Sequence, residues 1–376
     1  MRCDKREACS ARALIRVAVC IALSAAAIQT RAAWGADGGA ARPAFLDRPA
    51  EKTGHAARQL LLAAAWAGQR VVAVGQGGTV VLSDDGGLHW QQADSVPTSA
   101  TLTDVKFSDA RNGWAVGHLG VVLHTTDAGR TWTRQLDGNI AAKLTLKAVE
   151  EHEAGQSAEA AARALRLARM MVDDGPNKPF LAIGLTSADT IEAFGAYGLA
   201  LSSNDGGRTW TSIVSELPDP NGFHFYGTAL VGNERIVVGE RGTLLRGPDG
   251  HQLLPVVTPY SGTLFGLLKG RNDTLIAFGL QGTVLTSRDA GSTWSKVDSG
   301  LGASIQAGTV LSDGTIVLGS EGGQLVASRD DGQHFVPLKT LAQPAAGMLP
   351  IAKRALLVLG PRGAERVDLS AETELK

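Results

Sequence analysis

The chain has 376 residues, a net charge of −1, 46 glycines and three cysteines. Residues 1–32 contain six basic and two acidic side chains, so the remainder of the chain carries a charge of about −5. An acidic balance argues against nucleic-acid binding, which usually brings a basic surplus. The length is ample for the core of one large all-β domain.

Residues 1–36 are typical of an export signal. Two arginines precede an apolar stretch at 17–28, and small residues follow it, so cleavage is expected after Ala32 or after Gly35. The stretch is shorter than the roughly 20 residues that span a bilayer. We therefore expect an exported protein that is soluble in the periplasm, or an equivalent lumen, after cleavage.

All three cysteines, Cys3, Cys9 and Cys20, lie within that segment. The mature chain would therefore contain no thiol and no disulfide. Cys20 leaves a lipoprotein signal as an alternative. Against it, Val19 stands where a small residue is wanted, and the apolar stretch continues beyond the cysteine.

A short phrase recurs seven times in the rest of the chain: two to four apolar residues, a glycine, two variable residues and usually a second glycine. The first glycines of the copies are Gly75, Gly117, Gly195, Gly239, Gly279, Gly319 and Gly360. Five of the six intervals between them are 40 to 44 residues, and the sixth is longer by about 36. Self-similarity with this period indicates a propeller or another repeat array.

Each unit has the pattern of four short strands. In the second unit, apolar runs at 102–107, 113–117 and 120–126 are separated by turn residues, and 127–132 forms a third turn. Such runs are too short for independent helices and are typical of antiparallel strands. Seven units of four strands predict an all-β fold, a single seven-bladed β-propeller over residues 37–376.

The third turn carries a sharper signature, S/T-x-D-x-G-x-x-W/F. The copies are Ser83–Trp90, Thr125–Trp132, Ser203–Trp210, Ser287–Trp294 and Ser328–Phe335. The carboxylate can accept backbone N–H bonds across a hairpin turn, the glycine supplies a positive φ, and the aromatic ring packs beneath. The repetition indicates that these aspartates and aromatic residues are structural.

Residues 137–179 interrupt the strand pattern between the second and third units. Helical spacing of apolar residues at 140–153 and 158–172, with Ser157 as an N-cap and a Gly-Pro pair after the second run, predicts a helical hairpin. By strand parity this insertion shares a face with the turns between the second and third strands. We call those turns the second turns and this face the second-turn face; the third turns lie on the opposite face.

The third turns resemble the Asp-box, or bacterial neuraminidase repeat, of sialidases and sortilin-like propellers. The fuller phrase, from about Arg58 to Arg366, resembles the photosystem II stability/assembly factor family and its non-photosynthetic bacterial relatives. This resemblance implies a propeller that assists photosynthesis by stabilising a membrane-protein complex. It also implies that ligands bind the second-turn face. The Ala-, Gly- and Arg-rich composition and the large insertion depart from a compact photosynthetic member.

The second-turn residues are candidates for binding because they would form a mixed polar funnel around the ring axis. We expect Tyr197, Glu240 and Arg241 to be the strongest, since tyrosine and arginine are enriched at the energetic centres of interfaces. The other candidates are His118, Gln281, Glu321 and Arg362. The alternative is a ring of solvated turns that tolerate any residue.

Catalytic signatures are weak. The chain has no HExxH, CxxC or phosphate-loop motif, so no metal and no cofactor is expected. A sialidase-like site would need three arginines and a Tyr–Glu pair, and the only tyrosines are Tyr197, Tyr226 and Tyr260. Two carboxylates could still converge in a glycosidase site.

The leading hypothesis is a non-enzymatic, exported scaffold. It would be peripheral at a membrane, monomeric, and would assist a membrane-protein complex or an envelope transport system. The alternative is a glycan-binding or sialidase/glycosidase-like propeller.

Ring closure generates one more expectation. The seventh unit has strands at 355–359 and 364–369 but no convincing fourth strand. Because closure removes an exposed sheet edge, we expect residues before Arg58, around Phe45-Leu46-Asp47, to supply the missing outer strand and to place 43–50 beside 364–369.

Overall fold

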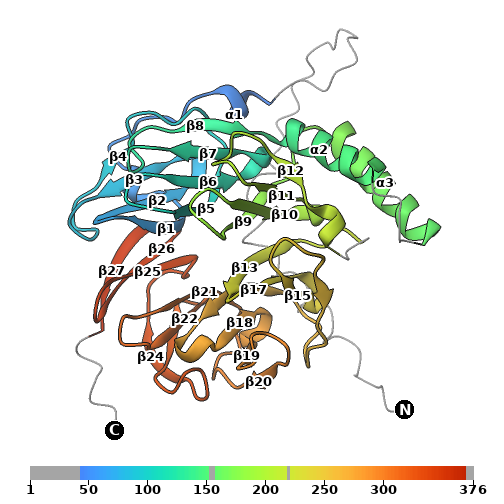
Figure 1. Ribbon diagram of the computed structural model, residues 1–376. Coiled ribbons are helices and arrows are strands. Elements are labelled where there is room, and N and C mark those ends of the chain that lie inside the picture. The colour runs from blue at the N-terminus through green and yellow to red at the C-terminus, as the bar shows by residue number, and fades with distance from the viewer. Residues whose placement is uncertain (1–42, 152–156, 218–220, 370–376) are drawn as a thin grey trace, which may run out of the picture. The chain divides into compact units, whose positions relative to one another are not determined.

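The computed structural model describes residues 43–151, 157–217 and 221–369, which lie within one compact unit, residues 40–376. The expected signal at 1–36 lies outside the described residues. Among the described helices, none combines the length and apolar character needed to cross a membrane. The described residues form seven antiparallel sheets, so the predicted seven-bladed β-propeller is confirmed (Figure 1).

The first four blades each contain four strands in chain order. Blade 1 has β1 (Leu61–Ala67), β2 (Arg70–Gly75), β3 (Val80–Ser83) and β4 (Gln91–Gln92). Blade 2 has β5 (Leu102–Phe107), β6 (Gly113–Gly117), β7 (Val122–Thr125) and β8 (Thr133–Leu136). Blade 3 has β9 (Phe180–Leu185), β10 (Ile191–Gly195), β11 (Ala200–Ser203) and β12 (Thr211–Ser212). Blade 4 has β13 (Phe225–Val231), β14 (Glu234–Gly239), β15 (Leu244–Pro248) and β16 (Leu254–Pro255).

The remaining blades follow the same order, but the last has only three described strands. Blade 5 has β17 (Leu264–Lys269), β18 (Leu275–Gly279), β19 (Val284–Ser287) and β20 (Ser295–Val297). Blade 6 has β21 (Ile305–Val310), β22 (Ile316–Ser320), β23 (Gln324–Ser328) and β24 (Val336–Thr340). Blade 7 has β25 (Gly347–Ala352), β26 (Ala355–Gly360) and β27 (Gly363–Asp368).

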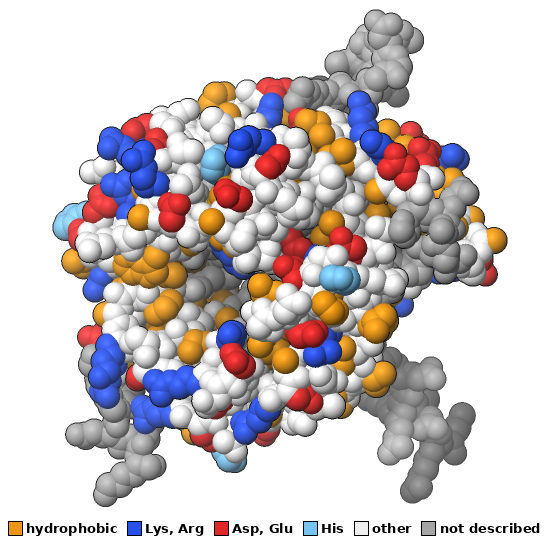
Figure 2. Space-filling view, in the orientation of Figure 1, with side chains coloured by type: hydrophobic (Ala, Val, Ile, Leu, Met, Phe, Trp, Pro, Cys, Tyr) orange, Lys and Arg blue, Asp and Glu red, His pale blue; other side chains and the backbone are white. Residues whose placement is uncertain are grey.

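The first strands of the blades surround the ring axis. Each contacts the first strand of the next blade, and β25 contacts β1, which closes the ring. The viewed face is hollowed near its centre, where these strands meet, and charged side chains of both signs are spread around it (Figure 2). The core lies between the blades: Val72 of blade 1 packs in one cluster with Leu123 of blade 2, and Leu359 of blade 7 packs with Val71.

The predicted turn chemistry of the Asp-boxes is confirmed. In blade 2, Asp127 Oδ1 accepts the Thr125 hydroxyl at 2.8 Å and the Thr131 amide at 2.9 Å. Gly129 has a φ of 85°, and its carbonyl accepts the indole N–H of Trp132 at 2.9 Å. The same aspartate-to-turn and aromatic arrangement recurs in blades 1, 3, 5 and 6, with the Trp N–H bond in those that carry Trp.

The chain before blade 1 corrects our expectation about the missing strand. Residues 43–50 are not an outer strand of blade 7, because Ala44–Asp47 form the short helix α1. Leu46 is fully buried in the cluster between blades 1 and 2, and the Phe45 carbonyl accepts the Ser99 amide at 3.0 Å. Burial of Leu46 therefore fixes this segment at another junction. The 3₁₀ turn η1 (Ala56–Arg58), not residues 43–50, contacts β27.

The predicted helical hairpin between blades 2 and 3 is confirmed as α2 (Gly138–Glu151) and α3 (Ala158–Asp173). Ser157 caps α3 by accepting the Ala160 amide at 3.2 Å. The helices pack on each other, and α2 also contacts β11 and β12. Ala141 and Met171 share a buried cluster with Trp210 of blade 3, so the hairpin is anchored to the propeller.

A buried ion pair joins blades 3 and 4. Arg235 of β14 and Glu192 of β10 are 2% and 3% exposed, and the guanidinium donates to Glu192 and to Glu216. Glu216 ends the 3₁₀ turn η5 (Val214–Glu216). Burial raises the pKa of Glu192 to about 7, although the charge of Arg235 opposes this shift.

We expect Trp132→Ala to lower the free energy of unfolding by about 3–5 kcal/mol, because it removes a buried ring. Chemical denaturation measures this loss. Leu88→Ala is the matched control, since Leu88 lies in the blade 1 turn and is 61% exposed; it should change stability little. An unchanged melting temperature with lost partner binding in Trp132→Ala would contradict the structural role.

The contribution of Glu192 to stability should fall as pH rises from about 4.5 to 7, while the lowered pKa values of His118 and His124 contribute with the opposite sign. The pKa of Glu192 is higher in the folded chain than its ordinary value of 4.5, so the folded state keeps a proton that the unfolded state has released. The loss over this window is up to about 3 kcal/mol and levels off above it. Glu192→Gln should flatten this slope in denaturation curves measured at several pH values, whereas exposed Glu159→Gln should not. A pH dependence of stability that is the same in Glu192→Gln and in the unchanged chain would refute the assignment.

Candidate functional site

The second turns of five blades share one backbone form. Each is a short 3₁₀ turn whose middle residue has a positive φ. They are η2 (Gln76–Gly78), η3 (His118–Gly120), η4 (Ala196–Gly198), η6 (Glu240–Gly242) and η8 (Leu280–Gly282). Blade 5 has a further 3₁₀ turn, η7 (Arg271–Asp273), between its first two strands. Because Gly75 at the end of β2 pairs with Leu61 at the start of β1, the second turns lie beside the starts of the first strands.

Tyr197 of η4 begins a row of aromatic rings that runs across blades 3, 4 and 5. Its ring lies 5.1 Å from His224, His224 lies 6.2 Å from Tyr226, and Tyr226 lies 5.4 Å from Phe265. Tyr197 is 38% exposed, and the other three rings are partly buried. Aromatic faces with one accessible side offer apolar area and polar edges together.

Charged groups accompany this aromatic row. Lys178 Nζ lies 4.7 Å from the centre of the Tyr197 ring, and the Arg241 guanidinium lies 5.7 Å from the Phe223 ring. Glu240 accepts the His224 amide at 3.0 Å, and its other oxygen is 3.6 Å from His224 Nδ1. The structure thus brings Tyr197, Glu240 and Arg241 together around His224.

The helical hairpin adjoins the same cluster. Arg163 of α3 donates to Asn221 at 2.7 Å, two residues before Phe223. A side chain at Gly222 would collide with Leu167 of α3, so helix and turn are in close contact. Ile140 and Met170 are large apolar side chains exposed on the hairpin. The contacts of Arg163 and Leu167 join α3 to the turn beside the aromatic row, and we call the row together with the adjoining hairpin the aromatic site.

The other four sequence candidates lie in separate second turns. Burial lowers the pKa of His118 in blade 2. Gln281 has a positive φ of 55° in blade 5, Glu321 accepts the Ser304 amide at 3.5 Å in blade 6, and the Arg362 amide donates to Gln343 in blade 7. These four are not part of the aromatic site.

Sequence reasoning missed Lys178, His224 and Phe265 as members of the site and considered Tyr226 only as a nucleophile. A signal was present in the repeat. In six blades, the pairing of the innermost strand with the next strand skips the second residue of the innermost strand. Among these six blades, the skipped residue is aromatic only in blades 4 and 5, where it is Tyr226 and Phe265. The corresponding residues in the other four are Leu62, Thr103, Leu181 and Gln306.

Tyr226 lies beside a histidine and near the carboxylate of Glu240. Its hydroxyl lies 3.4 Å from His224 Nδ1. Burial, with the Glu240 charge, raises the pKa of Tyr226 to about 12, which disfavours the phenolate that would attack a sugar. Within the described ranges, no group of three or more His, Cys, Asp or Glu side chains is placed to hold a metal ion.

Comparison with known proteins matches part of the sequence to photosystem II assembly factors. The family model described as photosynthesis system II assembly factor YCF48 matches residues 89–156. The photosystem II assembly lipoprotein Ycf48 of Synechococcus sp. (strain CC9902) is 26% identical over 148 residues, which are 38% of this chain and 33% of that protein. The chloroplastic photosystem II stability/assembly factor HCF136 of Cyanidioschyzon merolae (strain NIES-3377 / 10D) is 46% identical over 48 residues, 12% of this chain and 11% of that protein.

Solved structures share the fold over a much larger part of the chain. A structure of YCF48 bound to D1 peptide has a TM-score of 0.60 and 17% identity, covering 86% of this chain and 99% of that chain. A GH74 xyloglucanase from Xanthomonas campestris has a TM-score of 0.59 and 13% identity, covering 85% and 53%. The propeller alone thus does not separate scaffold from hydrolase. The partial sequence matches confirm the resemblance to the photosystem II stability/assembly factor family.

Proposed function

We propose that this protein is an exported, non-enzymatic scaffold that assists the assembly or stability of a membrane-protein complex by binding one of its segments at the aromatic site. A component of an envelope transport system belongs to the same class of membrane-protein partner. The proposal rests on the likeness to assembly factors and on one structural observation: side chains from three blades and the hairpin meet on a single face.

The composition of the aromatic site supports a polypeptide partner. Tyrosine and arginine dominate the energetic centres of protein interfaces, and here Tyr197 and Arg241 flank the acidic Glu240. The exposed Ile140 and Met170 extend the surface with apolar area. In the similar YCF48 structure a D1 peptide is bound, and we infer that a peptide segment is also the ligand here. The chain would act as a monomer at the periphery of a membrane.

The proposed compartment is the periplasm or an equivalent lumen. It rests on the export signal expected at 1–36 and on a chain whose cysteines all lie in that signal. The similar Synechococcus protein is a lipoprotein, which is consistent with assembly work beside a membrane.

Photo-crosslinking at position 197 should capture a membrane-protein segment from envelope membranes, and a crosslinker at position 88 on the Asp-box face should not. Arg241→Ala and Tyr197→Ala should each lower capture about tenfold or more, as expected for residues at the centre of an interface. Leu88→Ala is the control variant, because it shows whether substitution and purification by themselves change the folding of the protein or the amount captured. Crosslinks that map only to the Asp-box face would overturn the choice of face.

Deletion of 139–175 with a short Gly-Ser bridge should leave the propeller folded and weaken the same capture. The deletion also uncovers apolar surface of blade 3, because Ala141 and Met171 are buried there. Ile140→Ser with Met170→Ser is therefore the cleaner variant, since both side chains are exposed. Full capture by this double variant would remove the hairpin from the interface.

The competing glycosidase hypothesis makes an opposite prediction. It expects turnover of a fluorogenic glycoside that disappears in Tyr226→Phe and Glu240→Gln. We expect no turnover by the purified protein, because the proposed scaffold binds its partner without chemistry. If the purified protein hydrolysed the glycoside and both variants did not, the non-enzymatic scaffold hypothesis would be refuted.

A further inference from the structure

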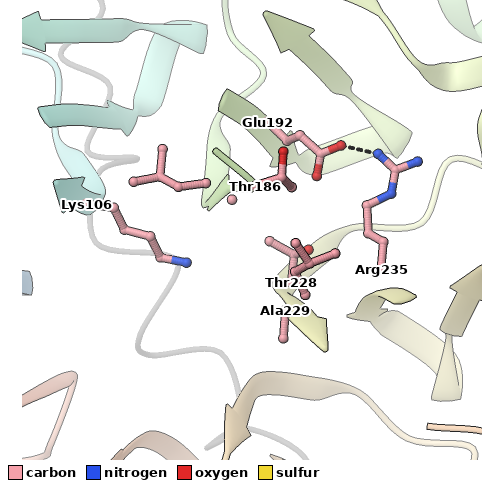
Figure 3. A pocket seen from close by; sticks show the side chains of 9 residues that line it. Lys106, Thr186, Glu192, Thr228, Ala229 and Arg235 are labelled. Atoms are coloured by element: carbon pink, nitrogen blue, oxygen red, sulfur yellow. Dashed lines mark hydrogen bonds and ion pairs between the residues drawn. The ribbon is translucent and has the colours of Figure 1, made fainter. Parts of the chain in front are cut away.

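A small cavity lies at the other end of the first strands, away from the aromatic site. It has a volume of about 60 Å³ and opens between blades 2, 3 and 4 (Figure 3). The residues that line it are Lys106, Gly184, Leu185, Thr186, Glu192, Thr228, Ala229, Leu230 and Arg235. A water molecule needs roughly 10–15 Å³ measured this way, so the cavity holds about four to six non-hydrogen atoms.

A buried oxygen of Glu192 at this cavity has no protein partner among the described residues. One oxygen of Glu192 binds Arg235, whereas the other, Oε2, accepts no hydrogen bond and faces the cavity (Figure 3). The Nε–H of Arg235 also lacks an acceptor. Both side chains are more than nine-tenths buried. Because a buried polar atom without a partner is costly, an occupant that donates to Glu192 Oε2 is favoured.

The opposite wall is cationic. Lys106 extends from β5 toward the cavity, facing Glu192 across it (Figure 3). The groups facing Glu192 are then Arg235, which pairs with it and with Glu216, Lys106 across the cavity, and the more distant Asp249. The hydroxyls of Thr186 and Thr228 add neutral partners. An occupant with separated positive and negative ends matches these walls better than an ion of one sign.

We propose that this cavity binds a small zwitterion, an α-amino acid of about the size of glycine. Its ammonium group donates to Glu192 Oε2, and its carboxylate accepts from Lys106 Nζ on the opposite wall. Glycine has about five non-hydrogen atoms and fits the volume. The inference does not depend on the proposed scaffold function, because the cavity and the aromatic site lie at opposite ends of the first strands.

The test follows the Arg235 Nε–H resonance by ¹H–¹⁵N NMR while the full mature chain is titrated with glycine. The expected result is a saturable shift of this resonance. Acetate and methylammonium each carry only one of the two charged groups, so each should bind at least tenfold more weakly than glycine. Equal binding of either fragment would show a site for one charged group only, and no saturable shift up to tens of millimolar glycine would show a water-filled cavity; either result would overturn the proposal.

Variants locate the two ends of the ligand. Glu192→Gln and Lys106→Met should each weaken glycine binding at least tenfold. Lys269→Met is the matched control, because Lys269 also ends a first strand but does not line the cavity; it should bind glycine as the unchanged chain does. Melting curves confirm that each variant is folded. Unchanged glycine affinity in folded Glu192→Gln and Lys106→Met would overturn the assignment.

Discussion

Apolar packing between neighbouring blades is the interaction on which the rest of this molecule depends. Within the described residues, hydrogen-bonded ladders join strands of the same blade only. What joins one blade to the next is largely a layer of buried side chains, such as Val72 against Leu123. Apolar burial is non-directional and scales with area, so the ring requires well-filled layers and Asp-box turns but places few demands on the second turns. This division leaves the second turns free to carry function.

The second turns show how function is added without changing the backbone. The middle residue has a positive φ in five blades, and it is Gly77 in one of them but Leu119, Tyr197, Arg241 and Gln281 in the others. A non-glycine residue there costs on the order of 1–2 kcal/mol, which the packed ring can offset. The backbone of these turns is therefore constant, and the side chain of the middle residue varies. Blades 3 and 4 differ from their neighbours in the side chains that they carry on the same turn backbone.

The features that could be predicted from the sequence are those that recur from one repeat to the next. The seven glycine phrases and five Asp-boxes predicted the blades, the turns and the face that carries Tyr197, Glu240 and Arg241. Long-range choices were not accessible: Phe45 and Asp47 looked like closing-strand residues, but burial of the neighbouring Leu46 at the first junction decided otherwise. The pairing of Glu192 with Arg235 joins residues 43 positions apart in different blades, and no local pattern announces such a pair.

The junction between blades 7 and 1 differs from the other six in having no covalent connection across it. Leu357 and Leu359 meet Val71 there, and the Trp66 indole donates to the Pro350 carbonyl over 284 residues. Blade 1 comes first in the chain, and its apolar layer that faces blade 7 has no cover until the last blade is available to pack on it. Loop-closure entropy also places this contact among the slowest to form. A chain that ends before blade 7 would therefore expose the apolar layer of blade 1. A quality-control factor that recognises apolar surface would distinguish such a chain from a closed ring.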